Sequence, residues 1–167
     1  YLSVTSNLAN VLGGSASLSF WLRGDQPGTS NPATAPGVTG VAGSGGSQWG
    51  CLDDSGRIGL ALDNASVVVS AASVQDGKWH HVVITRNATS GLTQVYVDGS
   101  LSASVSGPTG TRSLAFNSLG RVEGAGYFPG RLDQVTIFNR VITAQEVVTQ
   151  RDNHAPKSWN ITSDGVN

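Results

Sequence analysis

Hydrophobic and polar residues alternate along several short segments of the chain, most regularly in residues 17–23 (SLSFWLR). The leucines and the phenylalanine fall on one side of this segment, and the serines, Trp21 and Arg23 fall on the other. Because successive side chains of a β-strand point to opposite faces, this period of two predicts a half-buried strand. We expect its leucine and phenylalanine set to face the core.

Similar segments recur along the chain, and residues that favour turns lie between them. The Asp98-Gly99 pair between two β-rich segments is the strongest hairpin signal, because a type I′ turn needs positive φ at both central positions. The expected strands are residues 1–4, 17–23, 38–41, 48–52, 57–62, 66–71, 79–87, 93–97, 101–105, 114–119 and 131–139. This series predicts an all-β fold, a two-sheet antiparallel sandwich.

One segment favours a helix. In residues 143–151, Thr143 and Glu146 have the spacing of a capping box. We therefore expect one short C-terminal helix, a domain over residues 1–151, and a tail or linker over residues 152–167 that contains Trp159. Residues 24–47 are mostly Gly, Pro, Ser, Thr and Asn, and a polar loop of this length is either flexible or functional.

Composition narrows the classes of partner. The 167 residues suit one domain, and 13% of them are charged. With a formal net charge of −1, the chain has no excess of positive charge to attract a polyanion, so nucleic acid is not an expected partner. No apolar run approaches the ~20 residues that cross a bilayer, so membrane insertion is not expected. The single cysteine, Cys51, cannot form an internal disulfide and is expected as a small buried hydrophobe. Since methionine is absent, we expect a segment of a longer protein.

Two blocks carry a family resemblance. The first is residues 76–86 (DGKWHHVVITR), followed by residues 93–101 (TQVYVDGSL), and the second is residues 130–140 (GRLDQVTIFNR), which run into residues 142–147. In this order they resemble the central motif and the closing strand and helix of laminin-G-like (concanavalin-A-like) jelly-roll domains. The resemblance implies a jelly roll from a secreted or cell-surface multidomain protein, in a family that mostly binds and only sometimes catalyses.

Catalytic residues are sparse. Glycoside hydrolases on this jelly roll commonly place two glutamates and an aspartate on one strand, whereas this chain has only Glu123 and Glu146. Glycoside hydrolysis needs a pair of facing carboxylates. Asp53 and Asp54 are adjacent and are better suited to a turn, and His80 and His81 are adjacent on a strand and so point apart. We therefore expect no enzyme activity.

Asp133 is the candidate metal ligand. By strand alternation it shares a face with Val135 and Ile137, so its carboxylate would point inward and need a partner. The family resemblance implies that an aspartate here helps to hold a structural Ca²⁺ with loop carbonyls. The alternative is that Asp133 accepts backbone N–H bonds in a turn.

Alternation also suggests a binding face. It places Trp21, Arg23, Trp49 and Asp53 outward, with Arg57 and the small residues of the next strand beside them. Sugars stack on aromatic rings and take hydrogen bonds from such polar groups. The alternative is that Trp21 and Trp49 complete the core. Further candidates are Arg121 and Tyr127, in the loop of residues 120–128, since loops at a sandwich rim often carry function.

Three binding or structural roles follow. The first is a non-catalytic carbohydrate-binding module that takes a glycan or polysaccharide on a concave face or on rim loops. The second is an adhesion module that recognises an extracellular protein, and the third is a structural spacer. All three place the chain outside the cell, next to other domains of the same parent chain.

Overall fold

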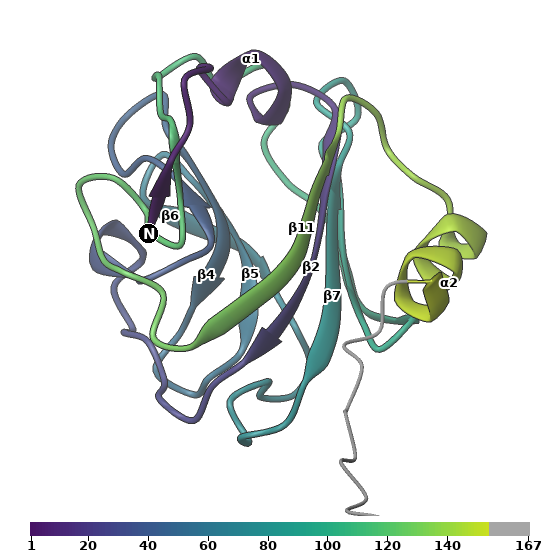
Figure 1. Cartoon of the computed structure of the whole chain (residues 1–167). Helices are drawn as coiled ribbons and strands as arrows, with labels where there is room; N and C mark the ends of the chain where they lie inside the picture. The colour runs from purple at the N-terminus through teal and green to yellow at the C-terminus, as the bar shows by residue number, and fades with distance from the viewer. Residues whose placement is uncertain (154–167) are drawn as a thin grey trace, which may run out of the picture.

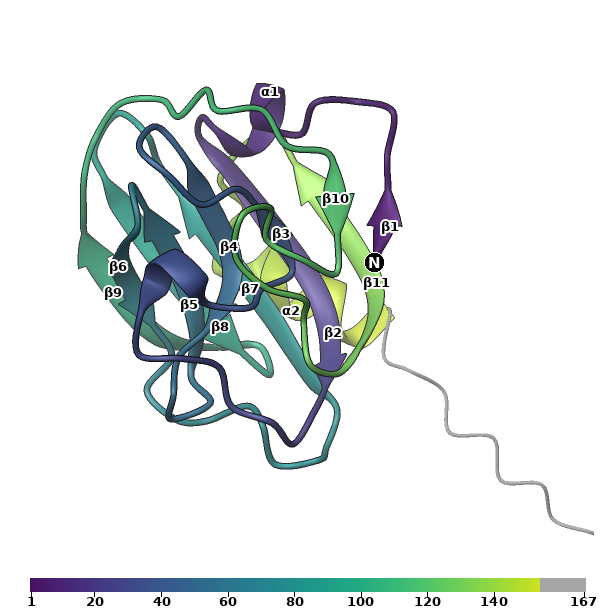
Figure 2. The same cartoon turned by 90° about the vertical axis from the view of Figure 1, so that its left-hand side faces the viewer.

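The computed structural model describes residues 1–153 as two antiparallel sheets packed face to face (Figures 1 and 2). One sheet has six strands in the order β1-β10-β3-β4-β5-β6, and the other has five in the order β11-β2-β7-β8-β9. In chain order the elements are β1 (Leu2–Ser3), α1 (Ala9–Leu12), β2 (Ala16–Arg23), the 3₁₀ turn η1 (Pro32–Thr34), β3 (Thr39–Gly40), β4 (Ser47–Leu52), β5 (Ile58–Leu62), β6 (Ala65–Val69), β7 (His80–Arg86), β8 (Leu92–Val97), β9 (Ser100–Ser106), β10 (Ser118–Leu119), β11 (Arg131–Phe138) and α2 (Ala144–Asn153).

The predicted sandwich and its C-terminal helix are confirmed. The strand expected over residues 114–119 is only the two residues of β10, and the short helix α1 was not predicted. Helix α2 ends at Asn153, two residues beyond the expected domain limit. The tail with Trp159 lies outside the described residues, and the division at residue 151 stays a prediction. No helix within residues 1–153 is long and apolar enough to span a membrane.

The core lies between the two sheets. From β2 it receives Leu18, Phe20 and Leu22, all fully buried, as the alternation predicts. The six-stranded sheet contributes Trp49 and Leu60, which are opposite each other on β4 and β5. Burial of such side chains stabilises the fold by about 1.5–3 kcal/mol each.

A β-bulge on β4 decides which side chains enter this core. The register of β4 and β5 shifts between Trp49 and Cys51, at Gly50, whose φ is +69°. In a regular strand, side chains three positions apart point to opposite faces. Because the bulge adds one residue, Trp49 and Leu52 both face the core. The predicted outward orientation of Trp49 is therefore wrong, and the alternative interpretation of Trp49 as a core residue is confirmed.

Helix α2 covers part of the outer face of the five-stranded sheet (Figure 1). Val147 of the helix and Ile142 before it pack on Val83 and Tyr96. The predicted capping box is present, since the Glu146 carboxylate accepts from the Thr143 N–H and the Thr143 hydroxyl accepts from the Glu146 N–H. This sheet therefore has limited open area on its outer side.

The adjacent histidines His80 and His81, at the beginning of β7, point apart as expected. His81 is buried, with its ring against Trp21 and its Nε2 3.0 Å from the Ser19 hydroxyl. His80 lies between two carboxylates, with Nδ1 2.8 Å from Asp98 and Nε2 3.0 Å from Asp76. Partial burial of the His80 ring opposes its charge, but the bonds to Asp98 and Asp76 outweigh this effect and raise the pKa of His80 above 6.5.

Replacement of Gly50 by alanine should destabilise the fold. A Cβ at Gly50 would lie 2.5 Å from Val38 Cγ2, and alanine also disfavours φ of +69°. The two effects together are expected to lower the free energy of unfolding by about 2–4 kcal/mol in urea titrations. Gly45→Ala is the matched control, because Gly45 has φ of +79° and no neighbour within 4 Å. Equal losses in the two variants would contradict the packing argument.

The His80 bridge should make stability depend on pH. Because folding raises its pKa, protonated His80 stabilises the fold fully below the unfolded value near 6.5, and this contribution is lost as pH rises through the folded-state pKa. Urea unfolding of the wild type and His80→Gln between pH 5 and 9 measures the effect. We expect the difference between the two proteins to shrink as pH rises, and a pH-independent difference would refute the linkage.

Candidate functional site

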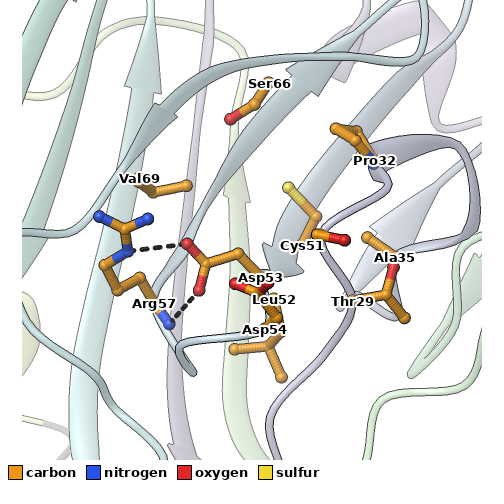
Figure 3. Close-up of a pocket in the computed structure, with 11 residues that line it drawn as sticks. Thr29, Pro32, Ala35, Cys51, Leu52, Asp53, Asp54, Arg57, Ser66 and Val69 are labelled. Carbon is orange, nitrogen blue, oxygen red and sulfur yellow. Dashed lines mark hydrogen bonds and ion pairs between the residues drawn. The ribbon is translucent and has the colours of Figure 1, made fainter.

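A pocket of about 210 Å³ opens on the outer side of the six-stranded sheet, under residues 28–35 (Figure 3). Asp53 and Arg57 from the turn between β4 and β5 lie at one side, and Thr29, Pro32 and Ala35 lie at the other. The remaining lining residues are Ser30, Cys51, Leu52, Asp54, Ser66 and Val69. The pocket combines hydroxyls and charges with small apolar side chains.

The loop that closes one side of this pocket is held by close backbone contacts. Gly28 donates its N–H to the Asp53 carbonyl at 2.8 Å, and a Cβ at Gly28 would lie 1.9 Å from the Leu52 carbonyl oxygen. Asn31 caps η1 by accepting from the Ala33 N–H at 3.0 Å. Residues 28–35 therefore form one wall of the pocket.

Asp53 holds Arg57 in place. One oxygen of Asp53 accepts from the Ser55 and Arg57 backbone N–H groups, both at 2.9 Å, and the other pairs with Arg57 Nε at 2.7 Å. The terminal guanidinium nitrogens of Arg57 make no hydrogen bond within residues 1–153, and its side chain is 42% exposed. Arg57 is therefore oriented through Nε while its outer donors stay available.

The cysteine at the floor of the pocket is unreactive. Cys51 is buried in a small cluster with Ala35 and Ala61, and burial raises the pKa of its thiol to about 12. A thiol with such a pKa is not a nucleophile at neutral pH. The small residues of β5, expected beside the binding face, do not form an open surface there, because Ala61 is fully buried in this cluster.

The sequence-predicted site residues divide between the two sheets. Trp21 and Arg23 lie on β2, on the outer face of the five-stranded sheet, whereas Asp53 and Arg57 belong to the other sheet. Trp21 is 8% exposed and its ring contacts His81. Its expected role as an exposed platform is therefore wrong, and no single face joins these four residues. Alternation assigns a residue to a face but does not say which sheet its strand enters.

Arg121 and Tyr127 do meet, in the loop before β11. They form an isolated bridge, and Tyr1, which was not among the predicted site residues, joins them. The Arg121 guanidinium carbon lies 4.0 Å from the Tyr1 ring centroid, and the two tyrosine rings are 5.7 Å apart. Tyr127 is 63% exposed, so this cluster offers an aromatic surface separate from the pocket.

Asp133 has a different orientation from the one predicted. A β-bulge between Asp133 and Thr136 places Asp133 opposite Trp21, on the outer face, while Val135 faces the core. Asp133 is exposed and accepts from the Gln134 N–H at 2.8 Å, which is the backbone-bonding alternative. The bulge residue Gln134 has φ of +51°, a conformation that usually favours glycine. Because the residue is a glutamine, the sequence carries no signal of the bulge.

The residues around Asp133 do not fit a calcium site. The adjacent hollow of about 520 Å³ has Asp133 as its one carboxylate, and no group of three or more potential metal-ligating side chains occurs in the part of the chain that the structure describes. Ca²⁺ prefers six to eight oxygen ligands. The Ca²⁺ site that the resemblance implied stays a prediction without a ligand set.

A family model described as the concanavalin A-like lectin/glucanases superfamily matches residues 1–148. A rat protein, "Sushi, von Willebrand factor type A, EGF and pentraxin domain-containing protein 1", is 30% identical over 99 residues. That match covers 53% of this chain and 3% of the rat protein.

Two solved structures share the fold at low sequence identity. The binding domain of botulinum neurotoxin serotype D/C superposes with a TM-score of 0.62 at 17% identity and covers 87% of this chain and 38% of its own. The CBM40 of Ruminococcus gnavus IT-sialidase, bound to α2,3-sialyllactose, superposes with a TM-score of 0.58 at 13% identity. The match covers 89% of this chain and 94% of the CBM40 chain.

Calcium removal is expected to leave the melting temperature unchanged. A single exposed carboxylate gives a Ca²⁺ ion too few ligands to stabilise the fold measurably. Thermal unfolding followed by circular dichroism in EDTA and in millimolar CaCl₂ compares the two conditions. A fall of several degrees in EDTA would establish a calcium site that these residues do not account for.

Proposed function

The chain belongs to the concanavalin A-like lectin/glucanases superfamily, and on this premise we propose that it is a non-catalytic carbohydrate-binding module. The observation that carries the proposal is the Asp53–Arg57 pair, which fixes a guanidinium at a pocket and leaves its terminal nitrogens available to sugar hydroxyls. The CBM40 neighbour, which is bound to sialyllactose, supports the same class of ligand.

The lining of the pocket suits one sugar residue. Arg57 and the hydroxyls of Ser30 and Ser66 can donate hydrogen bonds to a sugar, Asp54 can accept them, and Val69 offers an apolar contact. The pocket is smaller than the ~300–1,000 Å³ of pockets for drug-sized ligands. We therefore expect it to hold a chain end or a single unit of a polysaccharide.

The carboxylates support a binding role over hydrolysis. Glu146 is engaged in the capping box and pairs with Arg140, and Glu123 accepts from the Asn117 N–H and the Ser118 hydroxyl. Asp53 is committed to Arg57. Hydrolysis requires two carboxyl groups across a scissile bond, and no such pair lines the pocket apart from the adjacent Asp53 and Asp54.

We place the module outside the cell, beside other domains of its parent chain. The rat relative is a multidomain protein by its name, and the match spans 3% of its length. A second candidate function is recognition of an extracellular protein. The exposed Tyr1, Leu2 and Tyr127, each more than 60% exposed, favour it, because contiguous apolar surface marks contact sites.

Replacement of Arg57 by alanine should weaken glycan binding. We expect the affinity for a glycan identified on a broad glycan and polysaccharide panel to fall by about tenfold, since a hydrogen bond to a charged group contributes about 1.5–3 kcal/mol. Isothermal titration calorimetry measures it. Arg140→Ala is the matched control, because Arg140 is also an exposed arginine paired with a carboxylate.

Two results would contradict the proposal. Unchanged affinity in Arg57→Ala would remove the pocket from the binding site. No binding to any glycan would shift the assignment to protein recognition through the Tyr1–Tyr127 surface.

A further inference from the structure

Two arginines face each other on neighbouring strands without a partner. Arg23 ends β2 and Arg131 begins β11, and the antiparallel register places them directly opposite each other. Both are exposed on the outer face of the five-stranded sheet. Like charges directly opposite on adjacent strands destabilise a sheet, so an anion bound between them would stabilise this pair.

No side chain of the described residues supplies that anion. Neither guanidinium forms an ion pair or a side-chain hydrogen bond within residues 1–153, although the other arginines, 57, 86, 112, 121, 140 and 151, all do. The nearby carboxylates are those of Asp25 and Asp133. Asp25 bonds the neighbouring Gln26 amide, and Asp133 accepts from the Gln134 N–H.

The two arginines line a hollow of about 270 Å³ whose remaining walls are mostly backbone. It is lined by Arg23, Gly24, Asp25, Gly77, Pro129, Gly130 and Arg131. A Cβ at Gly130 would lie 2.6 Å from the Arg23 carbonyl oxygen, and one at Gly24 would lie 2.9 Å from the Pro129 carbonyl oxygen. Because glycine has no side chain, these positions contribute only backbone to the lining of the hollow.

The turn before β7 completes the hollow. Gly77 donates its N–H to the Gly24 carbonyl at 2.8 Å and thereby fixes the turn against the end of β2. The hollow is thus bounded by three segments that are far apart in sequence, the ends of β2 and β11 and this turn. Such a boundary is set by the fold and does not depend on a single loop.

We propose that Arg23 and Arg131 form a binding site for the carboxylate or sulfate group of an acidic glycan. A guanidinium donates two parallel hydrogen bonds to a planar carboxylate or to two sulfate oxygens. Two guanidinium groups outnumber the single carboxylate of Asp25 in the hollow. The proposal rests on the proposed function in that the ligand is a glycan, but the site lies on the other sheet from the Asp53–Arg57 pocket.

The test uses paired probes that differ only in the anionic group. Oligogalacturonate and its methyl ester test the carboxylate, and a sulfated galactan oligosaccharide and its desulfated form test the sulfate. Calorimetric titrations of the wild type should give binding to one or both acidic probes and at least tenfold weaker binding to the matching neutral form. Equal affinity for acidic and neutral forms would overturn the proposal.

Substitutions then locate the site. Arg23→Gln and Arg131→Gln should each weaken binding of the acidic probe by about tenfold, and Asp25→Asn should strengthen it. Arg140→Gln, which removes the same charge beyond the opposite end of β11, should change it less than twofold. An unchanged affinity in either Arg23→Gln or Arg131→Gln, or an equal loss in Arg140→Gln, would overturn the assignment.

A second measurement needs no glycan. Sulfate at the same ionic strength as chloride should raise the melting temperature of the wild type more than that of Arg131→Gln, because the general stabilising effect of sulfate is common to both proteins. Equal increases would argue against the site. Failure of the Asp53–Arg57 pocket as the glycan site is distinguishable, since Arg57→Ala would then leave the affinity for neutral glycans unchanged while the effects of Arg23→Gln and Arg131→Gln persisted. A protein that binds no glycan at all would fail the oligosaccharide titrations, and the sulfate measurement would still test the two arginines.

Discussion

One apolar layer buried between the two sheets holds this fold together. Each of the longer strands gives one face to that layer, so its opposite face must point away from the core. Phe20 on β2 and Trp49 on β4 illustrate the requirement, since both are fully buried from opposite sheets. The functional surfaces are therefore the residues that this layer leaves outside.

The bulge at Gly50 sets what the six-stranded sheet leaves outside. It directs Trp49 into the core and sends Cys51 and Asp53 to the opposite side, where residues 28–35 pass over them. Gly28 permits this passage because no side chain would fit against the Leu52 carbonyl. The same rule operates on β11, where the bulge at Gln134 keeps Asp133 in solvent and Val135 in the core. One extra residue in each strand thus determines which charged groups reach solvent.

The sequence predicts the sandwich well because period two and turn residues are local signals. It predicts the Asp98-Gly99 hairpin and the Thr143–Glu146 cap for the same reason. The predicted orientation of side chains is wrong where a bulge interrupts the alternation of inward and outward residues. For β4, Gly50 inside an apolar segment was the available signal of a bulge. Gln134 offered none. The separation of Trp21 from Asp53 could not be predicted, because strand order is a long-range property.

On the proposal made here, the outer side of the six-stranded sheet binds a sugar in the Asp53–Arg57 pocket. The most direct test is a ¹H–¹⁵N correlation spectrum of the protein recorded during titration with a glycan to which it binds. We expect the largest chemical-shift changes at the amides of residues 28–35, 51–57 and 66–69. Changes confined to α2 and strands β7 to β9, with the pocket amides unmoved, would contradict it.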